Sequence, residues 1–153
     1  MIEHAGTHAS KFDNKYATFP DMLEKAGYWI GYTGKGWGPG NYRDGGFKRN
    51  PAGPVFSSKK KSSGIKGVSS TDYAANFDAF LEQRPDGKPF YFWLGGHEPH
   101  RVFEKGIGLK KGKKLSDVDV PAFLPDTPEI RGDILDYYVE IEWFDSHLAR
   151  AMA

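Results

Sequence analysis

Residues 88–101 read KPFYFWLGGHEPHR, and this stretch decides how the rest of the chain is interpreted. Residues 90–94 form an unbroken apolar run with four aromatic side chains, which is typical of a strand buried on both faces of a parallel sheet. Pro89 precedes the run at a position where a strand tolerates a missing N–H donor, and two glycines end it. The sequence therefore predicts a short central strand.

Titratable side chains follow the strand and its two glycines, namely His97, Glu98, His100 and Arg101, with Pro99 among them. Ligands of open α/β sheets bind outside the carboxyl ends of the strands, so this cluster is a candidate site. Two other interpretations stay open. The histidines could simply cap backbone groups while Arg101 is solvated. They could also form the histidine half of a zinc finger, although the chain has no cysteine and Pro99 disfavours a helix with both on one face.

A second strand is predicted at residues 28–33, and it ends in the glycine-rich turn GKGWGPG at residues 34–40. Lys35 in this turn offers a positive charge to an oxyanion, and the glycines allow close approach of the backbone. The turn is no Walker loop, because it lacks the glycine spacing and the Lys-Ser/Thr pair. His4 and His8 lie among small and polar residues and are expected to be loop residues rather than ligands.

Three helices are expected around these strands, which gives an α/β fold with parallel strands and long loops. The first begins at Thr18 as N-cap and closes at Gly27. The second is capped by Ser70 or Thr71, and the third, the longest, begins near residues 126–129. Its apolar stripe is expected to pack on the sheet, and comprises Ile130, Ile134, Tyr137, Ile141, Phe144, Leu148 and Met152. Its acidic residues are expected to be solvated, and are Asp133, Asp136, Glu140, Glu142 and Asp145.

The composition excludes several classes of protein. The chain has 153 residues, a formal net charge of +1 and no cysteine, so disulfides and thiol chemistry are excluded and no global field favours nucleic acid or a membrane. No apolar run reaches membrane-spanning length. Lysines at residues 59–61 and 110–114 lie in irregular segments and are expected to be solvated. Residues 120–125 are expected to be extended between two prolines.

Three motifs together resemble the sulfatase family of the alkaline-phosphatase superfamily. They are TFPDMLEKAGYWIGYTGKGWGPG at residues 18–40, KPFYFWLGGHEPHR at residues 88–101, and VPAFLPDTPEIRGDILDYYVEIEWFDSHLARAM at residues 120–152. The arginine after the second histidine and the Gly-Pro after the lysine turn are similar to the branch of N-sulfoglucosamine sulfohydrolases, also called sulfamidases or heparan N-sulfatases. The resemblance implies a partial alkaline-phosphatase-like sandwich.

The resemblance also implies a mechanism and a substrate. In this family a formylglycine, made from cysteine or serine, is hydrated and attacks sulfur, while Ca²⁺ holds the sulfate oxygens. Lys35 and His100 match the family's catalytic lysine and histidine, and His97 and Arg101 are expected to contact substrate. A sulfated glycosaminoglycan or another sulfated sugar is the expected substrate, and the parent protein is expected to be periplasmic, secreted or lysosomal.

The sequence departs from the family pattern at several points. Trp37 occupies the position of a frequent family histidine, and no Cys-x-Pro-Ser-Arg or Ser-x-Pro-Ser-Arg segment or pair of calcium-binding aspartates is found. Residues 1–153 are therefore expected to be an internal portion of one sulfatase catalytic domain, without its calcium and formylglycine sites and inactive alone. Two alternatives stay open: a phosphodiesterase or phosphonate hydrolase of the same superfamily, and a non-catalytic module that binds anionic glycans.

Overall fold

The computed structural model describes residues 9–37 and 41–153, so His4, His8 and residues 38–40 of the lysine turn lie outside the described residues. The chain divides into two compact units. The first comprises Met1–Lys59 and Tyr73–Gly95, and the second comprises Lys60–Asp72 and Gly96–Ala153. Single-domain organisation over residues 1–153 stays a prediction.

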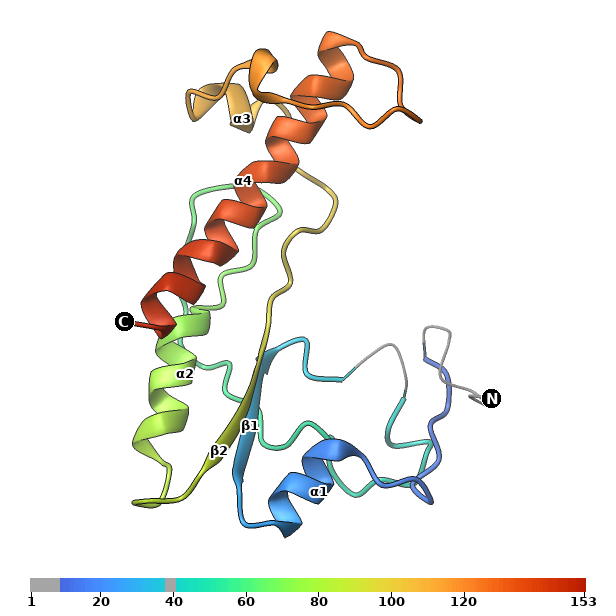
Figure 1. Cartoon of the computed structure of the whole chain (residues 1–153), viewed down its shortest axis with the longest axis vertical. Coiled ribbons are helices and arrows are strands. Elements are labelled where there is room, and N and C mark those ends of the chain that lie inside the picture. Colours follow the sequence, from blue (N-terminus) through green and yellow to red (C-terminus); the bar gives the residue numbers. More distant parts are fainter. Residues whose placement is uncertain (1–8, 38–40) are drawn as a thin grey trace. The chain divides into compact units, whose positions relative to one another are not determined.

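The predicted α/β fold with parallel strands is confirmed (Figure 1). The described elements are, in order, α1 (Phe19–Lys25), β1 (Trp29–Gly34), α2 (Tyr73–Glu82), β2 (Phe90–Gly95), α3 (Ile107–Lys110), the 3₁₀ helix η1 (Leu115–Asp117) and α4 (Pro128–Ala151). The first unit holds α1, β1, α2 and β2, and the second holds α3, η1 and α4.

The two strands pair in parallel over their full lengths. Trp29 lies opposite Phe90 and Gly34 lies opposite Gly95, so both strands end at the same level. Helix α2 covers one face of the pair through Phe80, which is fully buried and lies 4.6 Å from the ring of Phe92. These aromatic contacts form the core of the first unit, since each such pair adds stability beyond its buried area.

The prediction that β2 is buried on both faces was wrong. Phe90 and Trp93 are 40% and 46% exposed. The sheet of the described residues has two strands, so β2 has one neighbouring strand and not two. On the face that carries Tyr91, the covering side chain is Phe19 of α1, which is itself 53% exposed. An aromatic run thus identified the strand correctly, but it did not fix how much of the strand is covered.

Helix α1 begins and ends as its sequence indicates. The Thr18 side chain and the Asp21 backbone and carboxylate form a capping box, which satisfies N–H groups at the helix start. At the other end Gly27 adopts a φ of 92°, and the N–H groups of Gly27 and Tyr28 donate to carbonyls of the last turn. Its apolar side chains are only partly buried, because Met22, like Phe19, is more than half exposed.

Helix α2 begins two residues later than the predicted caps. Its first residue is Tyr73, so Asp72 precedes it directly and neither Ser70 nor Thr71 takes the capping position. The Ser69 hydroxyl instead accepts from the Thr71 N–H at 3.1 Å, which forms a local turn before the helix.

Helix α4 of the second unit begins at the predicted residue but buries a different face. The Thr127 hydroxyl accepts from the Ile130 N–H, and Pro128 occupies the first turn. The helix packs on α3 and η1. Its buried residues are Leu135, Asp136, Val139, Glu140 and His147. Most of the predicted apolar stripe is at least partly exposed, with Tyr137, Ile141 and Leu148 at 38–39% and Met152 at 80%.

Two further expectations for the second unit were wrong in part. Residues 121–124 form a turn, closed by the Leu124 N–H and the Pro121 carbonyl, rather than an extended segment. The segment expected to be irregular after Arg101 contains α3 and η1. Within residues 9–37 and 41–153, no helix is both long enough and apolar enough to cross a membrane.

We expect replacement of Gly34 by alanine to destabilise the first unit strongly. A Cβ at Gly34 would lie 1.9 Å from the Gly95 carbonyl oxygen, and the φ of 66° disfavours any side chain. The expected loss is about 3 kcal/mol of unfolding free energy, measured by urea denaturation.

Gly27→Ala is the matched control. Gly27 also has a positive φ, but a Cβ there meets no atom within 4 Å, so the expected loss is about 1–2 kcal/mol from backbone strain alone. Equal losses in the two variants would show that the close approach of the strand ends has no energetic weight.

Candidate active site

Lys35 is held by backbone contacts where the two strands end. Its N–H donates to the Gly95 carbonyl at 2.8 Å, and its own carbonyl accepts from the Trp93 indole N–H at 2.7 Å. Gly34 has a φ of 66°, which turns the chain out of β1 just before the lysine. The backbone of Lys35 is therefore fixed by β2, while its side chain is exposed.

Trp37 lies in an aromatic cluster two residues beyond Lys35. Its ring centroid is 5.4 Å from that of Phe12 and 6.1 Å from that of Phe47. An indole has no group that exchanges a proton near neutral pH. Trp37 therefore packs the loop against Phe12 and Phe47 and carries no acid–base chemistry.

Two buried glutamates hold the segment after β2 within the second unit. Glu98, 8% exposed, accepts from the Ser69 N–H at 2.7 Å. Glu140 of α4, 2% exposed, accepts from the His100 N–H at 2.8 Å. The backbone of the His97–His100 segment is thus anchored while the His100 ring is exposed, and His97 is half-buried.

Arg101 forms a bidentate ion pair with Asp133 of α4. Its two terminal nitrogens lie 2.9 and 2.5 Å from the carboxylate oxygens, and its guanidinium lies 4.7 Å from the centroid of Phe103. This hydrogen bonding raises the pKa of Arg101 and lowers that of Asp133. The pair is largely exposed, so it orients Arg101 more than it stabilises the fold.

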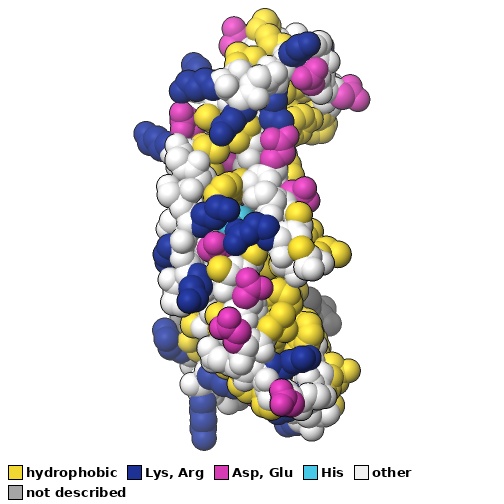
Figure 2. Space-filling model, turned by 90° about the vertical axis from the view of Figure 1, so that its left-hand side faces the viewer, with side chains coloured by type: hydrophobic (Ala, Val, Ile, Leu, Met, Phe, Trp, Pro, Cys, Tyr) yellow, Lys and Arg dark blue, Asp and Glu magenta, His cyan; other side chains and the backbone are white. Residues whose placement is uncertain are grey.

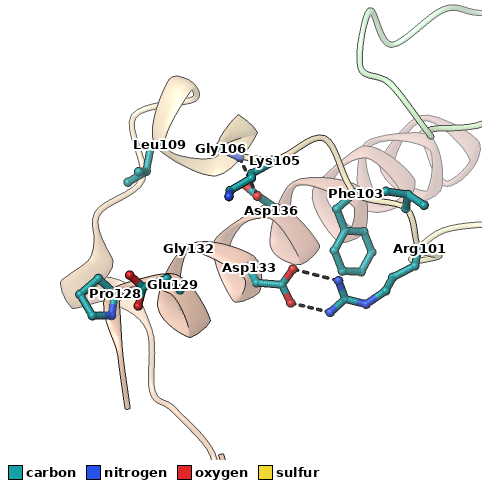
Figure 3. A pocket seen from close by; sticks show the side chains of 11 residues that line it. Arg101, Phe103, Lys105, Gly106, Leu109, Pro128, Glu129, Gly132, Asp133 and Asp136 are labelled. Carbon is teal, nitrogen blue, oxygen red and sulfur yellow. Dashed lines mark hydrogen bonds and ion pairs between the residues drawn. The ribbon is translucent and has the colours of Figure 1, made fainter. Parts of the chain in front are cut away.

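A pocket of about 520 Å³ opens beside this ion pair (Figure 3). It lies between α3 and the first turns of α4. Its lining includes Arg101, Phe103, Lys105, Leu109, Glu129, Gly132 and Asp133, together with Val102, Gly106, Pro128 and Asp136. Charged groups of both signs and apolar side chains therefore meet in one hollow of the second unit.

Asp136 fixes the backbone on one side of this pocket. Its two carboxylate oxygens accept from the Gly106 and Gly108 N–H groups at 2.7 and 2.8 Å, and the side chain is 3% exposed. A carboxylate that accepts two backbone hydrogen bonds offsets much of its desolvation. The expectation that Asp136 and Glu140 are solvated was wrong, because both are buried, Asp136 with these two hydrogen bonds and Glu140 with the one from the His100 N–H.

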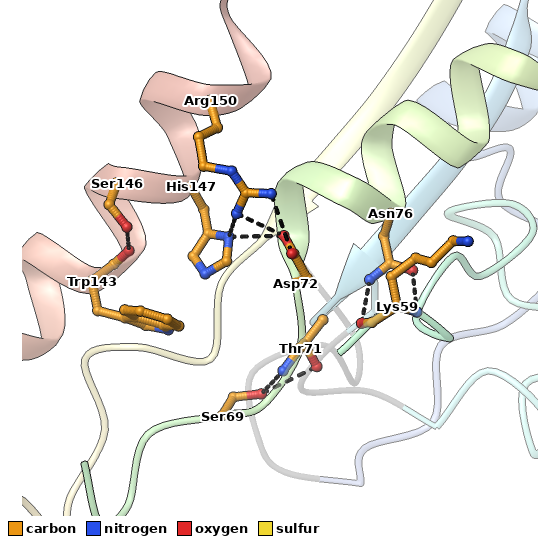
Figure 4. Close-up of polar contacts among 9 residues, drawn as sticks. All are labelled: Lys59, Ser69, Thr71, Asp72, Asn76, Trp143, Ser146, His147 and Arg150. Atoms are coloured by element: carbon orange, nitrogen blue, oxygen red, sulfur yellow. Dashed lines mark hydrogen bonds and ion pairs between the residues drawn. The ribbon is translucent and has the colours of Figure 1, made fainter. Parts of the chain in front are cut away.

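A buried charged cluster lies near the C-terminal end of α4 (Figure 4). His147 is fully buried, and its Nδ1 lies 3.3 Å from a carboxylate oxygen of Asp72. Arg150 donates to both oxygens of the same carboxylate at 3.0 and 3.2 Å. Burial lowers the pKa of His147, opposed by the Asp72 charge and assisted by Arg150 and Lys61.

Sequence reasoning did not identify Asp72, Asp136, Glu140 or His147 as structurally important. A signal was present, because positions 136, 140 and 147 recur at helical spacing beside Leu135 and Val139. Charged residues on the same face as buried aliphatic residues indicate hydrogen-bonded carboxylates.

The candidate site residues lie in different units. Lys35 belongs to the first unit, and His97, His100 and Arg101 belong to the second. That Lys35 and His100 act on one ligand stays a prediction. No group of three or more histidine, aspartate or glutamate side chains that could hold a metal ion occurs among the described residues.

The lysine-rich loops do not form an isolated basic surface. Lys110 pairs with Glu104 at 3.0 Å, and Lys113 pairs with Glu142. Figure 2 shows Lys and Arg side chains interspersed with Asp and Glu on the face that it draws. Mixed charge of this kind gives little general attraction for a polyanion.

Comparison with known proteins adds a family match. A protein-family model described as Sulfatase matches residues 2–147, which is nearly the whole chain. A search of curated proteins found no match.

We expect Asp136→Asn to destabilise the second unit by about 2–4 kcal/mol. An amide offers one acceptor oxygen, so one of the two N–H groups of Gly106 and Gly108 would face an NH₂ group. Urea unfolding measures the loss. Asp145→Asn on the exposed face of α4 is the control and should change stability by less than about 0.5 kcal/mol. Similar values for the two variants would contradict the role given to Asp136.

We expect stability to fall as the pH drops through about 6.5, the ordinary pKa of histidine. Because the pKa of His147 is lowered in the folded state, the unfolded chain takes up the proton first, and acid favours unfolding. Stability is fully present above that pH.

The measurement is thermal unfolding between pH 5.5 and 8. His147→Asn should be less stable overall but should lose this part of the pH dependence. His100→Asn, at an exposed ring, should keep it. Persistence of the full slope in His147→Asn would rule out His147 as its source.

Proposed function

We propose that this chain, which belongs to the sulfatase family, contributes Lys35 and His100 to a site that hydrolyses sulfate from a sulfated sugar. Membership rests on the family match over residues 2–147. The assignment of the two residues to one site is the proposal.

One observation carries the proposal. Gly34 and Gly95 lie opposite each other as the last pair of the parallel strands, and the Lys35 N–H is bonded to the Gly95 carbonyl. The His97–His100 segment begins two residues after Gly95. Both catalytic candidates therefore come from segments that leave the sheet at one edge, where ligands of α/β sheets bind.

These two side chains suit transfer of a sulfo group. Negative charge on the sulfur-bound oxygens is stabilised by a fixed cation, which the exposed ammonium group of Lys35 can supply. Hydrolysis breaks the bond from sulfur to the leaving nitrogen or oxygen, adds an oxygen of water to sulfur, and leaves a proton on the leaving atom. The imidazole of His100 is suited to carry that proton near neutral pH.

The residues of this chain do not fit the family's calcium ion or formylglycine. No suitable cluster of ligands occurs among the described residues, and the sequence has no cysteine and no Ser-x-Pro-Ser-Arg segment. No step proposed here passes through either group. We propose that other segments of a longer protein supply them, and that residues 1–153 are a portion of one catalytic domain.

N-sulfoglucosamine in a heparan-type glycan is the proposed substrate. The support is the arginine that follows His100, together with the Gly-Pro pair after the lysine turn. Arg101 and His97 are proposed to contact the sugar. A periplasmic, secreted or lysosomal location of the longer protein follows from the same proposal.

The test uses the longer protein and measures sulfate released from N-sulfoglucosamine and from O-sulfated sugars, and the alcohol released from a phosphodiester. Lys35→Ala and His100→Ala are each expected to lower kcat/KM about 100- to 1,000-fold. Lys25→Ala, which removes an exposed lysine from the last turn of α1, is the matched control and should leave it unchanged.

Three results would count against the proposal. Unchanged activity in both variants would remove Lys35 and His100 from the site. Faster cleavage of the phosphodiester than of the sulfated sugars would favour the phosphodiesterase class. Sulfate release by the purified 153-residue chain alone would show that no other segment is required.

A further inference from the structure

The pocket between α3 and α4 extends well beyond the ion pair of Arg101 and Asp133 at its edge. At about 520 Å³, it lies within the range of sites that hold small ligands. Its entire lining comes from the second unit, between Arg101 and Asp136. Figure 3 shows side chains from the loop after β2, from α3 and from the start of α4 around this space.

Gly132 of α4 borders this pocket. It lies in the second turn of α4, where glycine lowers helix stability relative to alanine. No packing constraint among the described residues explains it, since a Cβ at position 132 would meet no atom within 4 Å. A glycine inside a helix that no packing requires, and that borders a pocket, is consistent with a functional need for space there.

The charges of the lining are nearly balanced and mostly compensated within the protein. Arg101 and Asp133 neutralise each other, and Asp136 is satisfied by two backbone N–H groups. Lys105 and Glu129 attract each other across the pocket and are exposed. A sulfate group would therefore meet carboxylates as well as cations, which disfavours an anion.

Hydroxyl groups fit this lining better than an anion does. A hydroxyl donates to a carboxylate such as Glu129 and accepts from an ammonium such as Lys105. The C–H faces of a sugar ring can pack on the apolar part of the lining, which includes Phe103, Leu109 and Pro128. A saccharide ring offers both kinds of surface.

We propose that this pocket binds an uncharged saccharide unit, separate from the sulfo group that is hydrolysed. The proposal deepens the proposed function and rests on it for the choice of a sugar. In a glycan substrate, the pocket would hold a neighbouring unit of the chain, beside the segment that carries His100. Remote contacts of this kind position the bond that reacts.

The test is titration of the 153-residue chain, labelled with ¹⁵N, with N-acetylglucosamine and separately with N-sulfoglucosamine. The two probes differ in the charge of the nitrogen substituent. N-acetylglucosamine is expected to shift the amide signals of Phe103, Gly106 and Gly132 to saturation at about millimolar concentration, with little dependence on salt.

Gly132→Leu projects a side chain into the pocket from a position where the Cβ meets no atom within 4 Å, and it replaces a helical glycine, so it should raise Tm and abolish the saturable shifts. Ala149→Leu adds the same side chain at an exposed position of α4 and should keep them. Absence of saturable shifts, or shifts that survive in Gly132→Leu, would overturn the proposal. Tighter, salt-sensitive binding of N-sulfoglucosamine would overturn it in favour of an anion site.

These outcomes distinguish failure of this inference from failure of the proposed function. Sulfate release by the longer protein without sugar binding here would sink this inference alone. Sugar binding in this pocket without sulfate release would leave it standing and remove the proposed function.

Discussion

The hydrogen bond from Lys35 to Gly95 is the contact on which the account depends. It extends the parallel pairing one residue beyond Gly34 and fixes where the lysine leaves the sheet. Without that pairing, the lysine turn and the histidine segment, which are about 60 residues apart in sequence, would not start from the same edge of the sheet. Gly34 permits the contact, because any Cβ there would overlap the Gly95 carbonyl. The position of the Lys35 side chain therefore depends on the backbone geometry of the two strand ends.

In the second unit, carboxylates of α4 fix the positions of backbone segments through hydrogen bonds. Glu140 holds the N–H of His100, and Asp136 holds two N–H groups at the start of α3. Asp136 is compensated by both N–H groups that it binds, whereas Glu140 accepts one hydrogen bond through Oε2 and its buried Oε1 has no hydrogen-bond partner among the described residues. Long loops next to a site can be rigid for this reason. The same helix leaves Tyr137, Ile141 and Leu148 partly exposed.

Local signals in the sequence predicted the elements well. Helix ends are set by contacts within a few residues, and such contacts can be predicted from the sequence. Examples are Thr18 with Asp21 and Gly27 at the two ends of α1, and Thr127 with Pro128 at the start of α4. Burial was harder, because it depends on distant partners. Trp93 is exposed although its run is apolar, and Glu140 is buried although it is charged. The motifs identified Lys35 and His100 as candidates, but the carboxylates that anchor the backbone could be identified only from contacts in the three-dimensional structure.

The central claim is that the side chains of Lys35 and His100 face one ligand. Because the chain has no cysteine, a Lys35→Cys variant carries a single spin label, and its effect on the amide signals of His97 and His100 reports their distance directly. Strong paramagnetic broadening of both signals is predicted. Unbroadened signals from His97 and His100 in the folded protein would contradict it.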